Sequence, residues 1–215
     1  MKKINKTMVV DPLHPETALI QQAAALIRQG GVVVFPTLGL YGLGVDPFNA
    51  QAVARIFALK RRDASKPLLV LLAHPAMTAR VARPATPMAR RLMDHFWPGR
   101  VTFVLAARPD LSDNLTAGSG KIGVRQAAHP VAAALAQAVG GLIVGTSANI
   151  SGAAACAAVA DLDPAVLAAV DGVLDAGLLT GAPSTVVDVT GSAPVILRQG
   201  AVPAEQILTW NDRFV

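Results

Sequence analysis

Four positive charges lie within seven residues at 60–66 (KRRDASK), a density that mutual repulsion makes costly unless solvent or an anion pairs them. Lys60, Arg62 and Lys66 could clamp a polyphosphate, although the same charges could simply complement the dipole at a helix C-terminus. An earlier run, 36–44 (PTLGLYGLG), has three glycines that would let the backbone approach a ligand closely. Its spacing is that of neither a dinucleotide-binding loop nor a Walker A loop, so a plain glycine-rich turn remains the alternative.

Hydroxyl and amide side chains follow an apolar run at 145–152 (GTSANISG). Ser147 and Asn149 could join backbone N–H groups in a phosphate cradle, or could cap a following helix. Two arginines, Arg125 and Arg198, stand at the ends of apolar runs, where a guanidinium could hold a carboxylate through two parallel hydrogen bonds. Taken singly, each arginine is more often a surface residue. Because ligands of open α/β sheets bind beyond strand ends, these segments could nevertheless form one site.

The composition favours an anionic ligand and excludes several other classes of protein. The chain has 215 residues and a net charge of +5, with 19 basic residues against 14 acidic ones, of which only Glu16 and Glu205 are glutamates. A mechanism that needs a cluster of glutamates is therefore nearly excluded. The single cysteine, Cys156, excludes a disulfide framework and a multi-cysteine zinc site, and we interpret it as a small packing residue. The apolar run 8–10 is too short for a signal peptide, which predicts a cytoplasmic protein without a membrane span.

The elements that must position these residues alternate between helices and strands. Helices are predicted at Ala18–Gln29, Ala50–Arg61, Met88–Phe96, Val131–Val139, from Asp163-Pro164 onwards, and at Pro203–Leu208. Strands are predicted at Val32–Phe35, Leu68–Leu72, Val101–Ala106, Ile122–Arg125 and Leu142–Gly145, with a late antiparallel pair at Val186–Val189 and Val195–Arg198. This order predicts an α/β fold, a mixed β-sheet with helices on its faces, in one continuous domain over residues 1–215.

In their order and spacing, the segments resemble the YrdC-like family of threonylcarbamoyl-AMP synthases. The resemblance is carried by Pro36-Thr37, Tyr41-Gly42-Leu43-Gly44, Lys60-x-Arg62, Pro67-Leu68, Trp97-Pro98-Gly99, Val101-Thr102, Gly123-Val124-Arg125, Thr146 to Gly152, Ser184 to Asp188, and Leu197-Arg198-Gln199-Gly200. It covers residues 17–208, the core of the expected domain. The resemblance implies the short, single-domain form of the family, with a YrdC-like fold whose twisted sheet has a basic concave surface.

The resemblance also implies an activity and a site. Members of the family form threonylcarbamoyl-adenylate and diphosphate from L-threonine, bicarbonate and ATP, for the t6A modification of tRNA position 37, which makes the chain a nucleotidyltransferase. The implied ATP-binding residues are Lys60, Arg62, Lys66, Lys121, Ser147, Asn149 and Arg198, of which Lys60 and Arg62 would be catalytic. The implied threonine-binding residues are Thr37, Arg125 and Ser184. Mg²⁺ is expected with the ATP and no protein metal ligand is assigned; the expected partners are proteins of the t6A transfer step, with tRNA or double-stranded RNA on the basic concave face.

Four positions depart from the family pattern. Leu38 and Gly39 replace a Glu-Thr pair, Leu71 replaces a histidine, and Ala127 replaces a proline, and three of these positions lie on the amino-acid side of the expected site. Two alternatives therefore stay open: a paralogous adenylating or carbamoyl-transfer enzyme acting on another amine, and a double-stranded RNA-binding module. The chain has only nine aromatic residues for stacking on bases, which counts against the second alternative.

Overall fold

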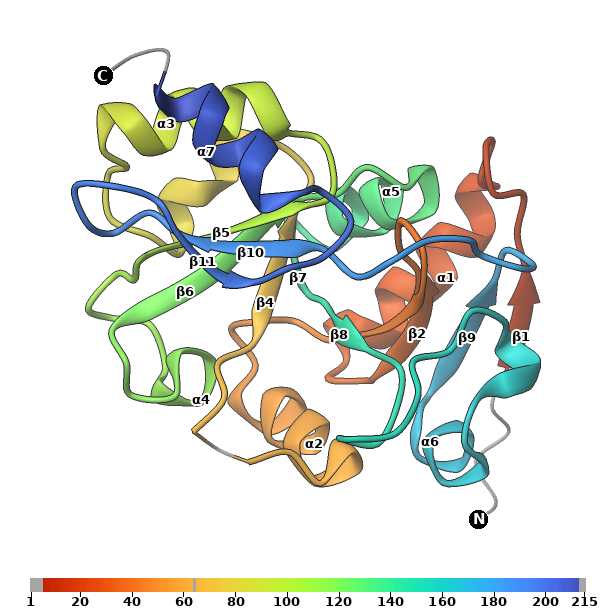
Figure 1. Cartoon of the computed structure of the whole chain (residues 1–215). Coiled ribbons are helices and arrows are strands. Elements are labelled where there is room, and N and C mark those ends of the chain that lie inside the picture. Colours follow the sequence, from red (N-terminus) through yellow and green to blue (C-terminus); the bar gives the residue numbers. More distant parts are fainter. Residues whose placement is uncertain (1–5, 64, 213–215) are drawn as a thin grey trace.

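The computed structural model describes residues 6–63 and 65–212 and contains two mixed β-sheets with helices packed against them (Figure 1). The five-stranded sheet has the order β1 (Lys6–Val9), β9 (Gly172–Asp175), β2 (Val33–Pro36), β3 (Tyr41–Gly44) and β8 (Thr146–Ser147). The six-stranded sheet has the order β11 (Val195–Arg198), β10 (Thr185–Asp188), β5 (Val101–Ala106), β6 (Lys121–Gln126), β4 (Leu69–Leu72) and β7 (Leu142–Val144). The expected α/β architecture with mixed sheet and flanking helices is confirmed, but its strands form two sheets instead of the one that was predicted.

Both sheets combine parallel and antiparallel pairs. In the first sheet, β2 pairs with β9 in parallel and with β3 antiparallel. In the second, β10 pairs with β5 in parallel and with β11 antiparallel, which confirms the late antiparallel pair. Because β5, β6, β10 and β11 are neighbours, the arginines near their ends are brought to one surface although they are far apart in the sequence.

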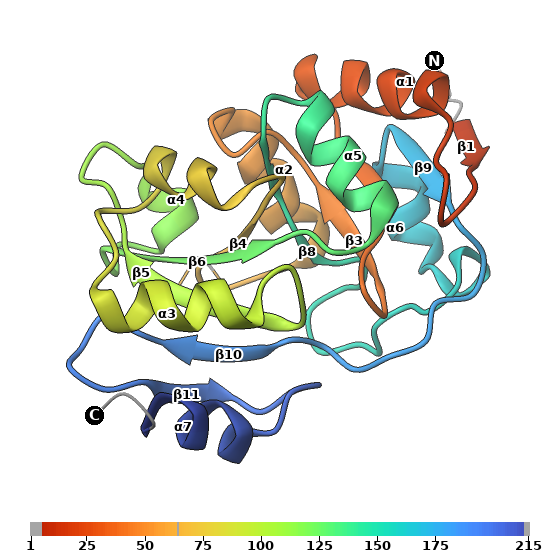
Figure 2. The same ribbon diagram turned by 90° about the horizontal axis from the view of Figure 1, so that it is seen from above.

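The helices cover the sheets in two groups around two apolar clusters. Helices α1 (Thr17–Arg28) and α5 (Pro130–Ala138) lie side by side and share a cluster with β2, β7 and β9 (Figure 2). The remaining elements surround the larger cluster: α2 (Ala50–Lys60), η1 (Pro75–Arg80), α3 (Pro87–Phe96), α4 (Asp113–Thr116), η2 (Val159–Asp161), α6 (Pro164–Ala169) and α7 (Ala204–Asp212). No helix in residues 6–63 or 65–212 combines the length and the apolarity that a membrane span requires.

The ends of α2 fix the first basic segment. The helix begins at Ala50, where its start was predicted, because the Asn49 side chain accepts a hydrogen bond from the Ala52 N–H at 3.0 Å. It ends at Lys60, one residue before the predicted end, because Arg61 adopts the left-handed conformation with φ of 47°. The chain therefore changes direction between Lys60 and Arg62, and these two cations have different surroundings.

The glycine-rich run is partly a strand. Residues 41–44 form β3, with every residue buried, where the sequence suggested a ligand-binding loop or a turn. A Cβ atom at Gly44 would lie 2.6 Å from Cδ1 of Ile143 and 2.8 Å from Cε1 of Phe35, so only glycine lets β3 pack this closely against the core. Cys156 is buried in the larger apolar cluster, in agreement with its interpretation as a packing residue.

Candidate functional site

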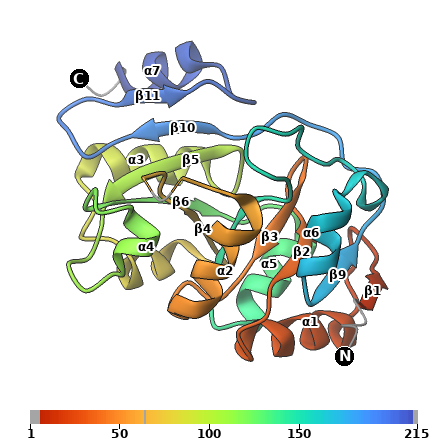
Figure 3. The same ribbon diagram turned by 90° about the horizontal axis from the view of Figure 1, so that it is seen from below.

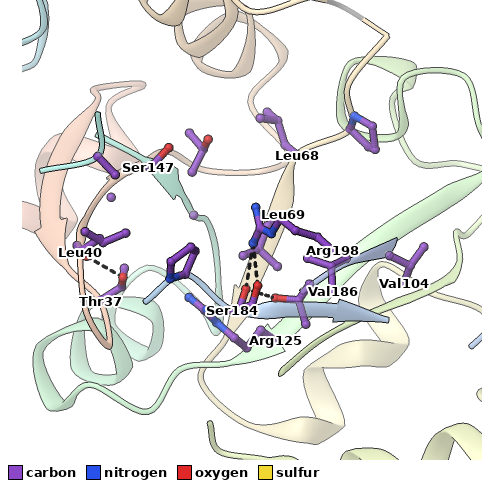
Figure 4. Close-up of a pocket in the computed structure, with 18 of the residues that line it drawn as sticks. Thr37, Leu40, Leu68, Leu69, Val104, Arg125, Ser147, Ser184, Val186 and Arg198 are labelled. Atoms are coloured by element: carbon purple, nitrogen blue, oxygen red, sulfur yellow. Dashed lines mark hydrogen bonds between the residues drawn. The ribbon is translucent and has the colours of Figure 1, made fainter. Parts of the chain in front are cut away.

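A cavity of about 430 Å³ lies where the two sheets meet (Figure 4), which is within the usual size range of small-molecule sites. The five-stranded sheet supplies β3 and β8 to its walls, and the six-stranded sheet supplies β4, β5, β6, β10 and β11. The lining residues with polar side chains are Thr37, Tyr41, Arg62, Thr102, Lys121, Arg125, Thr146, Ser147, Ser184 and Arg198. The site therefore draws on strands from the whole length of the chain.

The cavity wall is positively charged. It contains Arg62, Lys121, Arg125 and Arg198, and no aspartate or glutamate is among its lining residues. Among these cations, only Lys121 has a carboxylate partner in residues 6–63 and 65–212, since its Nζ lies 2.7 Å from Oδ2 of Asp188. Such an arrangement is suited to binding a ligand with several negative charges.

Arg125, in β6, is the least solvated of these cations. In the described part of the chain, its guanidinium has neither a hydrogen-bond acceptor nor a carboxylate partner. Burial, together with the charges of Arg198 and Arg100, lowers the pKa of Arg125 to about 10. A half-buried cation without a described partner is costly, and a carboxylate bound through the guanidinium fork would compensate it.

Arg198 and Ser184 are linked beside Arg125. The Nη2 atom of Arg198 donates to the Ser184 carbonyl at 2.8 Å, and the Ser184 hydroxyl lies 2.9 Å from that of Thr102 (Figure 4). One edge of the Arg198 fork is used by this contact. The remaining donors of Arg198 are free to bind an anion in the cavity.

Arg62 faces the same cavity from the loop after α2. Its Nε donates to the Lys66 carbonyl at 3.2 Å and its Nη2 donates to the Pro67 carbonyl at 2.9 Å. Burial lowers the pKa of Arg62, and the nearby charge of Arg198 lowers it as well. The two arginines repel each other across the cavity, and an anion between them would relieve this repulsion.

Lys60 has a different role from Arg62. Its side chain is buried, and its ammonium donates to the carbonyls of Ser147 and Asn149 at 2.5 and 2.7 Å and to Oδ1 of Asn149 at 3.1 Å. The Ser147 hydroxyl donates to the same Oδ1 at 2.6 Å, and the Asn149 amide donates to the Ala153 carbonyl at 2.6 Å. Lys60 and Asn149 thus hold the 147–153 loop from behind and present Ser147 to the cavity.

We expect Lys60→Met to destabilise the protein by about 2 kcal/mol or more, because it leaves buried carbonyl oxygens without a donor. Lys66→Met is the matched control, since Lys66 is exposed and no described side chain depends on its ammonium. Chemical denaturation of both variants measures the difference. Equal stability of the two variants would show that the Lys60 ammonium does not hold this loop.

Seven of the ten site residues expected from the sequence line the cavity. They are Thr37, Arg62, Lys121, Arg125, Ser147, Ser184 and Arg198, whereas Lys60, Lys66 and Asn149 do not line it. Sequence reasoning gave no ligand-binding role to Tyr41, Thr102 or Thr146, which also line the cavity. The spacing of Val53, Ile56 and Lys60 on one helical face is the signal that could have predicted the burial of Lys60.

The four departures lie around the cavity or behind it. Leu71, which replaces the family's histidine, is buried in the smaller apolar cluster. His74, three residues further along the chain, accepts a hydrogen bond from the Ala76 N–H. Neither residue lines the cavity. Gly39 packs against Gly181, where an added Cβ atom would lie 3.0 Å from the Gly181 carbonyl carbon. A side chain at position 39 would displace the segment at Gly181. The Gly181 backbone therefore fills the space that this side chain would need.

The donors around the cavity fit an anion better than a metal ion. Among residues 6–63 and 65–212, no group of three histidine, cysteine or acidic side chains is arranged to hold a metal. The cavity wall contributes hydroxyls but no carboxylate, and Mg²⁺ prefers carboxylates, phosphates and water. The residues present therefore do not form a protein-based Mg²⁺ site.

The family model Sua5/YciO/YrdC, described as "Telomere recombination", matches residues 25–200, which is more than half of the chain. The chain belongs to the Sua5/YciO/YrdC family. The matched range includes all the cations of the cavity wall.

Relatives within the Sua5/YciO/YrdC family carry the name threonylcarbamoyl-AMP synthase. The Bacillus subtilis protein is 37% identical over 201 residues, which are 93% of this chain and 58% of the relative. The Halorhodospira halophila protein is 44% identical over 132 residues, which are 61% of this chain and 69% of the relative. The chain thus spans just under three fifths of the length of the Bacillus relative.

Solved structures agree with the Sua5/YciO/YrdC assignment. Pyrococcus abyssi Sua5, solved in complex with L-threonine, matches with a TM-score of 0.86 and 34% identity over 94% of this chain and 59% of that one. Escherichia coli YciO matches with a TM-score of 0.83 and 27% identity over 95% of this chain and 100% of that one. HypF in a phosphate- and nucleotide-bound form is 20% identical, with a TM-score of 0.74, and shares the fold.

Proposed function

We propose that the protein forms threonylcarbamoyl-AMP and diphosphate from L-threonine, bicarbonate and ATP. The observation that carries the proposal is a cavity wall with four cations and no carboxylate, in a chain whose relatives are named threonylcarbamoyl-AMP synthase. A relative of known structure binds L-threonine, and the Arg125 guanidinium, which has no carboxylate partner among the described residues, suits an amino-acid carboxylate. These relatives favour neither another amine as the acceptor nor a double-stranded RNA-binding module.

The ATP phosphates are assigned to Arg62, Arg198 and the Ser147 hydroxyl, with Lys121 sharing its charge with Asp188. In this proposal Lys60 and Asn149 position Ser147 without touching the nucleotide, because their polar atoms already bond to the loop. Lys66 is not assigned a contact. Mg²⁺ would enter with the triphosphate and keep water and phosphate oxygens as ligands.

The amino acid is assigned to the end of the cavity that Arg125 and Ser184 form. Arg125 would hold the threonine carboxylate through its fork, and Ser184 and Thr37 offer hydroxyls to the remaining polar groups. The Thr37 hydroxyl donates to the Leu40 carbonyl at 2.6 Å, so it would serve the substrate as an acceptor. The threonine amine would then point toward the phosphates, where the new bond must form.

The proposed chemistry makes few demands on acid–base groups. The threonine amine and bicarbonate combine to a carbamate with loss of water, and a carbamate oxygen then attacks the α-phosphorus of ATP while diphosphate leaves. Negative charge grows on the non-bridging oxygens and on the diphosphate, and fixed guanidinium groups stabilise it there. This step makes the protein a nucleotidyltransferase, and it explains why a site without glutamate would suffice.

The wider role follows from the product. Threonylcarbamoyl-AMP would serve the t6A modification of tRNA through further proteins of that transfer step, which implies a cytoplasmic protein. Direct contact with tRNA or double-stranded RNA stays a prediction from the sequence. We also propose that residues 1–215 form one domain, because strands of both sheets build the same cavity.

Diphosphate release with ATP, Mg²⁺, bicarbonate and a panel of amino acids tests the proposal. We expect release that depends on threonine and bicarbonate together. Release with a different amine would identify the paralogous activity. No release with any amino acid, together with salt-sensitive RNA binding, would support the RNA-binding module instead.

A further inference from the structure

The segment 176–184 connects β9 with β10 and has no regular secondary structure (Figure 3). We call it the strap. Its last two residues, Pro183 and Ser184, line the cavity, and Ser184 is the partner of Arg198. The position of the strap therefore sets the boundary of the cavity at its proposed amino-acid end.

The strap is fixed at two places along its first half. At its start, the Tyr41 hydroxyl donates to the Gly177 carbonyl at 2.7 Å and accepts from the Ala176 N–H at 2.9 Å. Further along, the Leu179 side chain is buried in the larger apolar cluster. Both contacts lie before the part of the strap that reaches the cavity.

Gly181 lies in that second part, between the loop at Gly39 and the side chain of Arg100. A Cβ atom added to Gly181 would lie 2.9 Å from Nη2 and 3.0 Å from Cζ of Arg100 and would overlap Nη1. The guanidinium of Arg100 is thus placed directly against the Gly181 Cα. Gly181 has φ of 148°, a conformation that residues with a side chain rarely adopt.

The Arg100 guanidinium makes no other polar contact with the described residues. Within the described ranges it has no ion pair and no hydrogen-bond acceptor, and it does not line the cavity. The Arg100 carbonyl accepts from the Thr185 N–H at 3.0 Å, so the residue before β5 is joined to the first residue of β10, directly after the strap. Its charge is close enough to Arg125 to disfavour the charged form of Arg125.

We propose that Arg100 is a positioning residue, which supports the strap at Gly181 and thereby sets the affinity of the site for its amino acid. A carboxylate bound to Arg125 would neutralise the charge that repels Arg100, so the guanidinium could settle more firmly against the strap. Amino-acid binding should therefore tighten the strap. The identity of the amino acid rests on the proposed function, whereas the contact between Arg100 and the strap does not.

Hydrogen–deuterium exchange of the full-length protein, with and without L-threonine, tests this inference. We expect the 176–184 amides of Arg100→Ala to exchange faster than those of the wild type, and Arg100→Lys to restore most of the protection. Steady-state kinetics should show the KM for the amino acid rising about tenfold in Arg100→Ala, with the KM for ATP unchanged. Arg83→Ala is the matched control, because Arg83 is exposed and lies beside the opposite end of β5.

Gly181→Ala tests the same contact from the other side, because the added Cβ atom would push the guanidinium away. Alanine is also strained at the φ of Gly181, so the contact is measured by the coupling: the loss of protection in the double variant with Arg100→Ala should be smaller than the sum of the two single losses. Wild-type exchange in the strap of Arg100→Ala, or an unchanged amino-acid KM despite faster exchange, would overturn the inference. If the wild type releases no diphosphate with any amino acid, the proposed function fails, and the exchange of the free protein still decides the role of Arg100.

Discussion

Replacing Arg125 by methionine is expected to abolish amino-acid binding while making the folded protein more stable. The substitution removes both donors of a charge-assisted fork, which together correspond to a loss of roughly 100-fold or more in amino-acid affinity. It also removes a poorly solvated cation that has no described partner and that Arg198 and Arg100 repel. Replacing such a charge with an apolar side chain of similar length should raise the free energy of unfolding by about 1 kcal/mol or more.

These two opposite effects make the Arg125 prediction specific. Calorimetric titration with L-threonine measures the affinity, and chemical denaturation measures the stability. ATP binding should change less than threonine binding, because the phosphates are assigned to Arg62, Arg198 and Ser147, all of which remain in the variant. The exposed Arg83 is again the control, since Arg83→Met should alter neither quantity. A stable Arg125→Met variant that still binds threonine like the wild type would refute the assignment of the carboxylate.

Replacing Arg62 by alanine is expected to weaken ATP binding by roughly 10- to 100-fold. A hydrogen bond to a charged group is worth about 1.5–3 kcal/mol, and about 1.4 kcal/mol corresponds to a tenfold change in affinity. The substitution also relieves the repulsion between Arg62 and Arg198. The loss of ATP affinity should therefore be smaller than the loss of two hydrogen bonds alone would give. Ser147→Ala should weaken ATP binding less, because it removes one neutral hydroxyl from the same wall.

Arg61→Ala is the matched control for Arg62, because Arg61 is the adjacent arginine, is exposed, and does not line the cavity. Calorimetric titration with Mg²⁺ and ATP compares the variants. Equal ATP affinities for Arg61→Ala and Arg62→Ala would mean that net charge, and not the geometry of the cavity, governs binding. Unchanged affinity in both Arg62→Ala and Ser147→Ala would show that the phosphate assignment is wrong.

Local patterns in the sequence were sufficient for most helices and for the polar strand ends. The Asn49 cap and the late antiparallel pair follow from side-chain chemistry and alternation within a few residues. The functional motifs likewise indicated which residue types surround the cavity. They did not indicate which way each side chain points, so Lys60 and Arg62 were grouped although α2 buries the first and the left-handed Arg61 turns the second into the cavity.

Features that depend on distant segments could not be predicted from local patterns. The division into two sheets depends on pairings such as β1 with β9 and β3 with β8, whose strands lie more than a hundred residues apart. Residues 41–44 pack as a buried strand only with glycine at position 44, because Phe35 and Ile143 leave no room for a side chain there. The contact of Arg100 with Gly181 joins two positions that no motif connects.

The most direct test of the proposed function is the product formed from ¹³C-labelled bicarbonate. The purified protein is incubated with ATP, Mg²⁺, L-threonine and the labelled bicarbonate, and the adenylates are analysed by mass spectrometry. We predict threonylcarbamoyl-AMP that carries one labelled carbon, formed together with diphosphate and absent when threonine or bicarbonate is left out. Conversion of ATP without any labelled adenylate, or an unchanged yield with Arg125→Met, would contradict the account.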